Sequence, residues 1–139
     1  MSPVAKLLHT ARTRTTGGRE HGISRSSDGE LDLRLSTPGS MRIGANPEQL
    51  FAAAWSASLE SAIELAARKR RIDLPVGLSI EAEVDLCVAN GADSLRARLD
   101  ISLPGVERKV AQALVDEARQ TCVYFKATRS NLDVSIKLV

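Results

Sequence analysis

One stretch of the chain, residues 50–67, is apolar almost all the way round when it is read as a helix. It holds seven alanines together with large apolar side chains, and its polar interruptions stay small until Glu60 and Glu64. Asn46 suits an N-cap and Pro47 the first helical position. Because a helix that is apolar on all sides is typical of a protein's centre, we predict a long, centrally buried helix. The basic run 68–71 fits the C-terminus of this helix better than a nucleic-acid patch.

The clearest alternation of apolar and polar residues follows this helix. Apolar residues occupy every second position from 76 to 88, and again from 95 to 103 after an Asn-Gly pair. This period is typical of strands with one wet face, so we predict a long antiparallel hairpin. Arg96, Arg98 and Asp100 lie on its polar face, where we expect charge pairs with the first strand. Cys87 falls on the polar phase as well, and an exposed or edge-covered thiol is favoured there over a catalytic one.

The other elements are shorter. We predict strands over 4–16 and 19–26 around a Gly-Gly turn, a strand over 31–35, and an irregular loop over 37–46. A helix with one apolar stripe is expected over 106–121, a loop over 123–130 and a final strand over 132–138. The result is a single α+β domain over residues 1–139 with mainly antiparallel pairing.

Composition excludes several classes of protein. The net charge of +2 is far from that of a dedicated nucleic-acid binder, and four aromatic residues are too few for a base-stacking platform. No apolar run reaches the length of a membrane span, and the N-terminal residues do not resemble a signal peptide. Two cysteines cannot form a disulfide scaffold, and His9 and His21 lack metal-ligand spacing, so no metal site is expected. A cytoplasmic location is the expectation.

Four polar residues remain as candidates for chemistry, and the residues alone leave each of them open. Arg19 follows a glycine turn, Glu48 begins the long helix, Ser58 lies inside it, and Cys122 ends the second helix. Each also has a structural explanation: a turn residue, a partner of the helix dipole, a packing residue and a small buried hydrophobe.

Four segments together resemble the organic hydroperoxide resistance proteins. They are Thr-Gly-Gly-Arg at 16–19, Leu-Asp-Leu at 31–33, Asn-Pro-Glu-Gln-Leu-Phe-Ala-Ala at 46–53, and the stretch 122–133. These proteins belong to a wider family of osmotically inducible, thiol-dependent peroxidases, and the arginine after paired glycines favours the organic-hydroperoxide branch. The resemblance implies antiparallel sheets wrapped around central helices in an intertwined homodimer. It also implies reduction of fatty-acid or aryl hydroperoxides to alcohols, with no bound cofactor and a dihydrolipoyl group on a protein as reductant.

The resemblance also assigns roles to the four candidates. Family members carry the attacking cysteine twelve residues after the asparagine of the helix motif, and here that position is Ser58. Cys122 matches the resolving cysteine, and Arg19 and Glu48 match the family's arginine and glutamate. A thiolate next to a cation can attack a peroxide bond, whereas a serine hydroxyl barely ionises near neutral pH. We therefore predict that the chain folds normally but lacks turnover, with a cysteine-to-serine replacement favoured over a natural serine paralogue.

Helix geometry bears on how these residues can meet. Glu48 and Ser58 are separated by about 15 Å along one helix and by about 80° around it, so they cannot touch directly. Arg19 can bridge them only if the chain bends or a second subunit supplies one group, which fits the homodimer.

The helix also supplies the expected substrate pocket. Phe51, Trp55 and Leu59 lie near Ser58 along the sequence, and Met41 precedes the helix in a loop that could cover it. They predict an apolar pocket for an organic hydroperoxide, although filling the core is an equal explanation. Ala54 and Trp55 stand where glycine and tyrosine are usual in the family. The alternative function is a non-catalytic protein that binds a lipid or a lipoyl-type ligand in this pocket.

Overall fold

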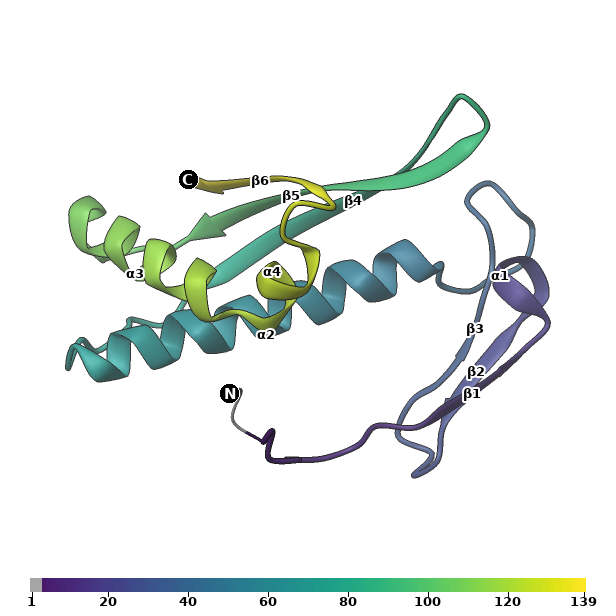
Figure 1. Ribbon diagram of the computed structural model, residues 1–139, viewed down its shortest axis with the longest axis horizontal. Helices are drawn as coiled ribbons and strands as arrows, with labels where there is room; N and C mark the ends of the chain where they lie inside the picture. Colours follow the sequence, from purple (N-terminus) through teal and green to yellow (C-terminus); the bar gives the residue numbers. More distant parts are fainter. Residues whose placement is uncertain (1–3) are drawn as a thin grey trace. The chain divides into compact units, whose positions relative to one another are not determined.

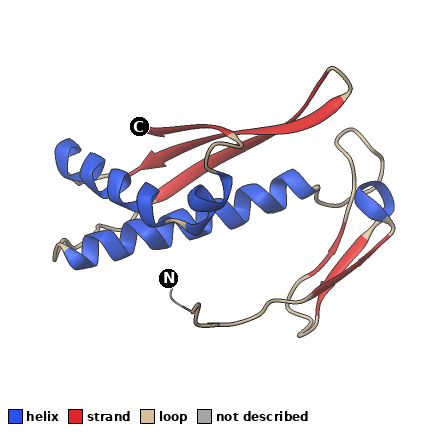
Figure 2. Cartoon of the chain, viewed as in Figure 1, coloured by secondary structure: helices blue, strands red, loops and turns tan. Residues whose placement is uncertain are grey.

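The computed structural model describes residues 4–139 and has the predicted α+β fold (Figures 1 and 2). The chain forms two compact units, one up to Pro47 and one from Glu48 onward. The single domain over residues 1–139 stays a prediction.

The N-terminal unit is a three-stranded antiparallel sheet in the order β1-β2-β3. Its elements are β1 (Thr13–Thr16), α1 (Gly18–His21), β2 (Ile23–Ser26) and β3 (Asp32–Arg34). The first strand is much shorter than predicted. The hairpin around the Gly-Gly pair is confirmed, because β1 and β2 pair antiparallel, but its connection is longer than a two-residue turn. Gly17 and Gly18 have φ angles of 82° and 70° and lead into the single helical turn α1, so β2 begins only at Ile23.

The C-terminal unit packs three helices against a second sheet (Figure 1). It contains most of α2 (Pro47–Lys69), together with β4 (Ser79–Ala89), β5 (Ala92–Ser102), α3 (Arg108–Thr121), α4 (Val123–Thr128) and β6 (Asp133–Leu138). The predicted β4–β5 hairpin is confirmed, and β6 adds to β5 in parallel, the one exception to antiparallel pairing among the described strands. Residues 123–128, expected as part of a loop, form the short helix α4.

Helix α2 is buried along one side only, so its expected all-round burial is wrong for a single chain. Its buried side chains, which join the core with β5, β6, α3 and α4, are Trp55, Leu59, Ile63, Ala66 and Ala67. Ala53, Ala57, Ser61 and Leu65 recur at every fourth position along another side, and all four are exposed.

The charged face of the hairpin has the expected pairs for Arg96 and Arg98, but the expectation is wrong for Asp100, which lies opposite Glu81. Glu83 lies opposite Arg98 in the strand register, and Asp85 lies opposite Arg96. Arg98 donates two hydrogen bonds to Asp85, of 2.7 and 2.9 Å, and Arg96 donates one of 2.6 Å. These bonds, first those from Arg98 and then that from Arg96, lower the pKa of Asp85 well below the ordinary value.

The apolar phase of the hairpin is not buried along its whole length. Leu86 and Val88 near the tip are 48% and 71% exposed, and Val76 before the first strand is fully exposed, contrary to the predicted inward orientation. β6 pairs only with residues 96–101 of β5, so the tip of the hairpin extends beyond the third strand. Cys87, on the opposite phase, is half-buried and forms no disulfide.

Candidate functional site

Ser58 and Cys122 lie side by side, although 64 residues separate them in the sequence. The Ser58 Oγ and Cys122 Sγ atoms are 3.6 Å apart and form a hydrogen bond. Ser58 lies midway along α2 and is half-buried, and Cys122 is only 2% exposed. The structure therefore brings together the two positions that the resemblance assigns to the attacking and resolving cysteines.

The backbone at Cys122 places its thiol against α2. This residue is extended, with φ −65° and ψ 124°, and separates α3 from α4. Its N–H donates to the Ala118 carbonyl at 2.8 Å, and its carbonyl accepts from the Lys126 N–H at 3.2 Å. Both backbone groups are therefore hydrogen-bonded, which fixes the backbone from which the buried thiol reaches Ser58.

All four aromatic residues of the chain gather next to this pair. Phe51 and Trp55 project from α2, with ring centroids 5.3 Å apart, and Tyr124 and Phe125 belong to α4. The Phe51 centroid lies 6.1 Å from that of Tyr124, and Trp55 meets Phe125 edge-on at 5.0 Å. The two pairs lie in separate segments of the sequence, and only the packing of α4 on α2 joins them.

Trp55 carries an unsatisfied polar atom in this apolar cluster. Its side chain is fully buried, and its Nε1–H has no hydrogen-bond partner among the described residues. Leaving a buried donor unpaired costs about 1–3 kcal/mol. A hydrogen bond from this N–H to an oxygen of a bound molecule would remove that cost. Leu59, the next predicted pocket residue, is fully buried in the core.

The remaining predicted residues lie elsewhere in the chain. Arg19 belongs to α1 of the N-terminal unit, and Glu48 occupies the first turn of α2. Both side chains have interaction partners. Met41 is 99% exposed, so in this chain it covers nothing. The approach of Arg19 and Glu48 to Ser58 stays a prediction.

Two residues that sequence reasoning missed hold the segment that carries Arg19. The Gly22 carbonyl accepts hydrogen bonds from the Leu35 N–H at 2.8 Å and from Arg42 Nη2 at 2.9 Å. A Cβ atom on Gly22 would lie 2.1 Å from the Gly18 carbonyl oxygen, so only glycine fits there. Arg42 Nε also donates to the Leu35 carbonyl at 2.8 Å. The sequence signal for this arrangement was the glycine that follows Arg-Glu-His, because a glycine often ends a helical turn.

Residues 4–139 hold neither a metal-binding cluster nor a membrane-spanning helix. No group of three or more metal-ligating side chains comes together within that range. None of the helices there has the length and hydropathy needed to cross a membrane.

Comparison with known proteins gives this arrangement a family. Residues 37–137 match the family model for OsmC-like protein. The chain belongs to the OsmC-like family. The organic hydroperoxide resistance protein of Xanthomonas axonopodis pv. citri is 41% identical over 142 residues, which cover 99% of each chain. Organic hydroperoxide resistance protein OhrB of Bacillus subtilis is 36% identical and covers 94% of this chain and 98% of its own.

Solved OsmC-like structures have the same fold. The crystal structure of Bacillus subtilis OhrB superposes with a TM-score of 0.89 at 36% identity, covering 96% of this chain and all of that one. A Vibrio cholerae organic hydroperoxide resistance protein, with captopril bound in one of its active sites, superposes at 0.88 with 29% identity, covering 96% and 93%. The resemblance stated from sequence is therefore confirmed at the level of family and fold.

Proposed function

We propose that this chain is an organic hydroperoxide peroxidase of the cytoplasm in which Ser58 has replaced the attacking cysteine. The observation that supports this proposal most directly is the 3.6 Å distance between Ser58 Oγ and Cys122 Sγ, beside an aromatic cluster. A thiol at position 58 would have a second thiol within reach and an apolar surface beside it. As written, the chain has the site but lacks its nucleophile.

The proposed reaction of the cysteine form has three steps. The thiolate at position 58 attacks the peroxide oxygen and becomes a sulfenic acid, while the O–O bond breaks and the alkoxide leaves and takes up a proton as an alcohol. The Cys122 thiolate then attacks the sulfenic sulfur, which forms a disulfide and releases water. Two electrons from a dithiol restore both thiols. A disulfide needs its sulfur atoms about 2.05 Å apart, so a side-chain rotation of modest size closes the observed distance.

Arg19 and Glu48 are proposed to activate this nucleophile. A guanidinium close to a thiol favours the thiolate, and a carboxylate that accepts two hydrogen bonds would hold the guanidinium in place. Serine gains nothing comparable, because its hydroxyl stays protonated next to the same cation. In this proposal, the residues at positions 58 and 122 determine whether peroxide reduction is possible, and Arg19 and Glu48 determine its rate.

The substrate is proposed to be a fatty-acid or aryl hydroperoxide. Of the predicted pocket residues, Phe51 is half-buried beside position 58, whereas Trp55 and Leu59 are fully buried in the core against which it packs. A substrate is proposed to contact Phe51 first and to reach the unpaired Trp55 Nε1–H only if the aromatic cluster rearranges. These apolar side chains favour an organic hydroperoxide over hydrogen peroxide. The proposed reductant is a dihydrolipoyl group on a protein, a small dithiol on a long arm.

The assembly is proposed to be a homodimer. Ala53, Ala57, Ser61 and Leu65 form an exposed stripe on α2, and small residues allow a second helix to approach closely. A second copy packed there would bury the side of α2 that a single chain leaves open. Light scattering at micromolar concentration is expected to give twice the chain mass, and a monomer would contradict the assembly.

The function is tested by restoring the thiol. Ser58→Cys is expected to consume cumene hydroperoxide with dihydrolipoamide as reductant, whereas the unchanged chain consumes none. Ser56→Cys is the matched control, since Ser56 also lies on α2 but its hydroxyl bonds to the Ala52 carbonyl at 2.8 Å. Turnover only in Ser58→Cys supports the peroxidase.

Two other outcomes would speak against the proposal. No turnover in Ser58→Cys, with lipoamide or a fatty acid bound by both forms, would indicate the non-catalytic binding protein instead. Peroxide-dependent loss of a thiol in the unchanged chain, located by labelling, would point to chemistry by Cys122 or Cys87 alone.

A further inference from the structure

A cavity that Phe125 lines and Trp55 does not lies between α3, α4 and β6. Its volume is about 250 Å³, and its lining includes Arg119, Arg129, Leu132 and Val134 as well as Phe125. The apolar members come from α4, from the residue before β6 and from β6 itself, and the arginines come from the end of α3 and from the residue after α4. It belongs entirely to the C-terminal unit.

The charge of this cavity is positive and uncompensated. Its lining holds two arginines and no aspartate or glutamate. The Arg119 guanidinium carbon lies 5.6 Å from the Phe125 ring centroid, a cation–π distance. Neither Arg119 nor Arg129 forms an ion pair among the described residues, in contrast to Arg70, which pairs with Glu117. Asp133 alternates with Leu132 and Val134 along β6 and so faces the other side of the sheet.

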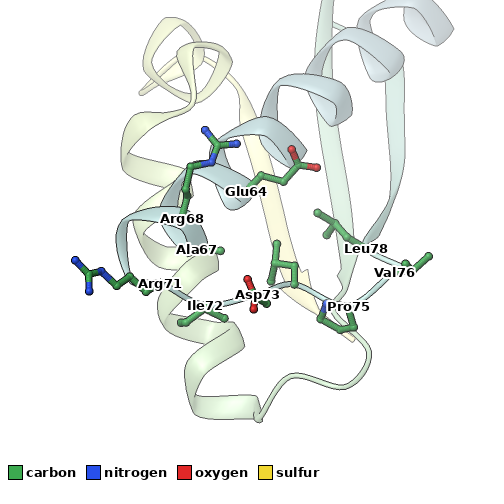
Figure 3. A pocket seen from close by; sticks show the side chains of 11 residues that line it. Glu64, Ala67, Arg68, Arg71, Ile72, Asp73, Pro75, Val76 and Leu78 are labelled. Carbon is green, nitrogen blue, oxygen red and sulfur yellow. The ribbon is translucent and has the colours of Figure 1, made fainter.

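The larger cavity of the unit lacks this character. It has a volume of about 760 Å³ and lies at the C-terminal end of α2 and the loop before β4 (Figure 3). Arg68 and Arg71 line it, but so do Glu64 and Asp73, and its net charge is zero. In Figure 3 both arginine side chains extend away from Leu78 and Pro75. This cavity therefore gives no preference for an anion.

We propose that the cavity between α3, α4 and β6 is a binding site for a small amphiphilic carboxylate. The carboxylate group accepts hydrogen bonds from Arg119 and Arg129, and the hydrocarbon part lies on Phe125, Leu132 and Val134. The volume is below the ~300–1,000 Å³ of drug-sized ligand sites, so a short chain fits and a long fatty acid extends into solvent. Arginine is suited to this role because its fork of donors matches a carboxylate.

The site is linked through Phe125 to the aromatic cluster near Ser58 and Cys122. Phe125 contacts Trp55 on one side and Arg119 on another, and Trp55 is the single tryptophan of the chain. A ligand that moves Phe125 thus reaches the aromatic cluster through one contact. The site itself requires no peroxidase chemistry, so it stands or falls separately from the proposed function.

The test is a titration of the unchanged chain with octanoate, followed by methyl NMR. We expect saturable shifts of the Leu132 and Val134 methyl groups, and at least tenfold weaker binding of octanamide, which has the same chain but no charge. Arg129→Gln and Arg119→Gln are each expected to weaken octanoate binding about tenfold, the size typical of one charge-assisted hydrogen bond. Arg68→Gln, in the larger cavity, is the matched control and should leave the affinity unchanged.

The site would be overturned by equal binding of octanoate and octanamide, or by equal weakening of octanoate binding in Arg68→Gln and Arg129→Gln. It would also be overturned if the methyl shifts were confined to Ile72 and Leu74 of the other cavity. Absence of any shift at millimolar octanoate would overturn it as well. Arg129 carries the decisive variant, because Arg119 also packs on Phe125 and its loss alters that ring.

Discussion

The ring of Phe125 stands edge-on to Trp55, with centroids 5.0 Å apart and planes at 74°. This contact joins α4 to α2. Phe125 lies three residues after Cys122, and Trp55 lies three residues before Ser58. The short helix therefore does more than connect α3 to β6: it presents the Cys122 thiol to α2 and closes the aromatic cluster. Loss of this contact should loosen the thiol and the core together.

Phe125→Ala is expected to destabilise the chain by about 3–5 kcal/mol, the usual cost of emptying a buried phenylalanine site. Phe125 is 8% exposed, so little of its area is in water already. Urea denaturation measures the change. Val123→Ala is the control in the same helix, since Val123 is 62% exposed and should change stability by less than about 0.5 kcal/mol. Similar midpoints for the two variants would contradict the role of Phe125.

Trp55→Phe is expected to change the free energy of unfolding by no more than about 1 kcal/mol. The smaller ring leaves a cavity, but it also removes a buried N–H that has no partner, and the two effects oppose each other. Leu59→Ala, one turn further along the buried side of α2, is the comparison and should cost about 2–5 kcal/mol. A loss for Trp55→Phe as large as that for Leu59→Ala would mean that the indole nitrogen is satisfied in solution.

The sequence predicted the elements whose periods repeat and missed those set by single residues. Helix α2 and the β4–β5 hairpin each repeat their pattern over many residues, so both were recognised. The helical turn α1 and the helix α4 are too short for a period, and Gly17 and Gly18 resembled a hairpin turn. The parallel pairing of β6 with β5 depends on the path of α3 and α4, which no local pattern records.

The site was predicted from the family resemblance and not from spacing. Nothing local places Ser58 beside Cys122, because 64 residues and two sheet strands separate them. The four aromatic residues lie in two distant segments, and their meeting depends on α4, which was expected as a loop. The exposed stripe on α2 was not predicted, because a pattern of apolar residues does not distinguish alanines that face the core of one chain from alanines that face a second chain.

Asp85→Asn is expected to lower the melting temperature at pH 7, with a difference that shrinks in acid. Hydrogen bonds from Arg98 and Arg96 hold the pKa of Asp85 below its ordinary value of 3.8. A carboxyl whose pKa is lower in the folded state contributes stability above the unfolded pKa, and the contribution is lost as pH falls below it. Glu81→Gln is the control, because Glu81 lies opposite Asp100 and its charge has no cation across the strand. A constant Asp85→Asn difference from pH 7 to pH 2 would refute the ionic explanation.

Gly22→Ala is expected to disrupt the turn that carries Arg19. The new Cβ would lie 2.1 Å from the Gly18 carbonyl oxygen, so the backbone must move and the hydrogen bond from Leu35 N–H to the Gly22 carbonyl must lengthen. Hydrogen exchange at the Leu35 amide should accelerate at least tenfold. Gly29→Ala provides the control: it also strains a backbone with φ 78°, at about 1–2 kcal/mol, but its Cβ meets nothing and it lies outside this turn. In the Ser58→Cys background, Gly22→Ala should reduce peroxide turnover far more than Gly29→Ala does. Equal activities in the two double variants would show that the turn does not position Arg19 for the reaction.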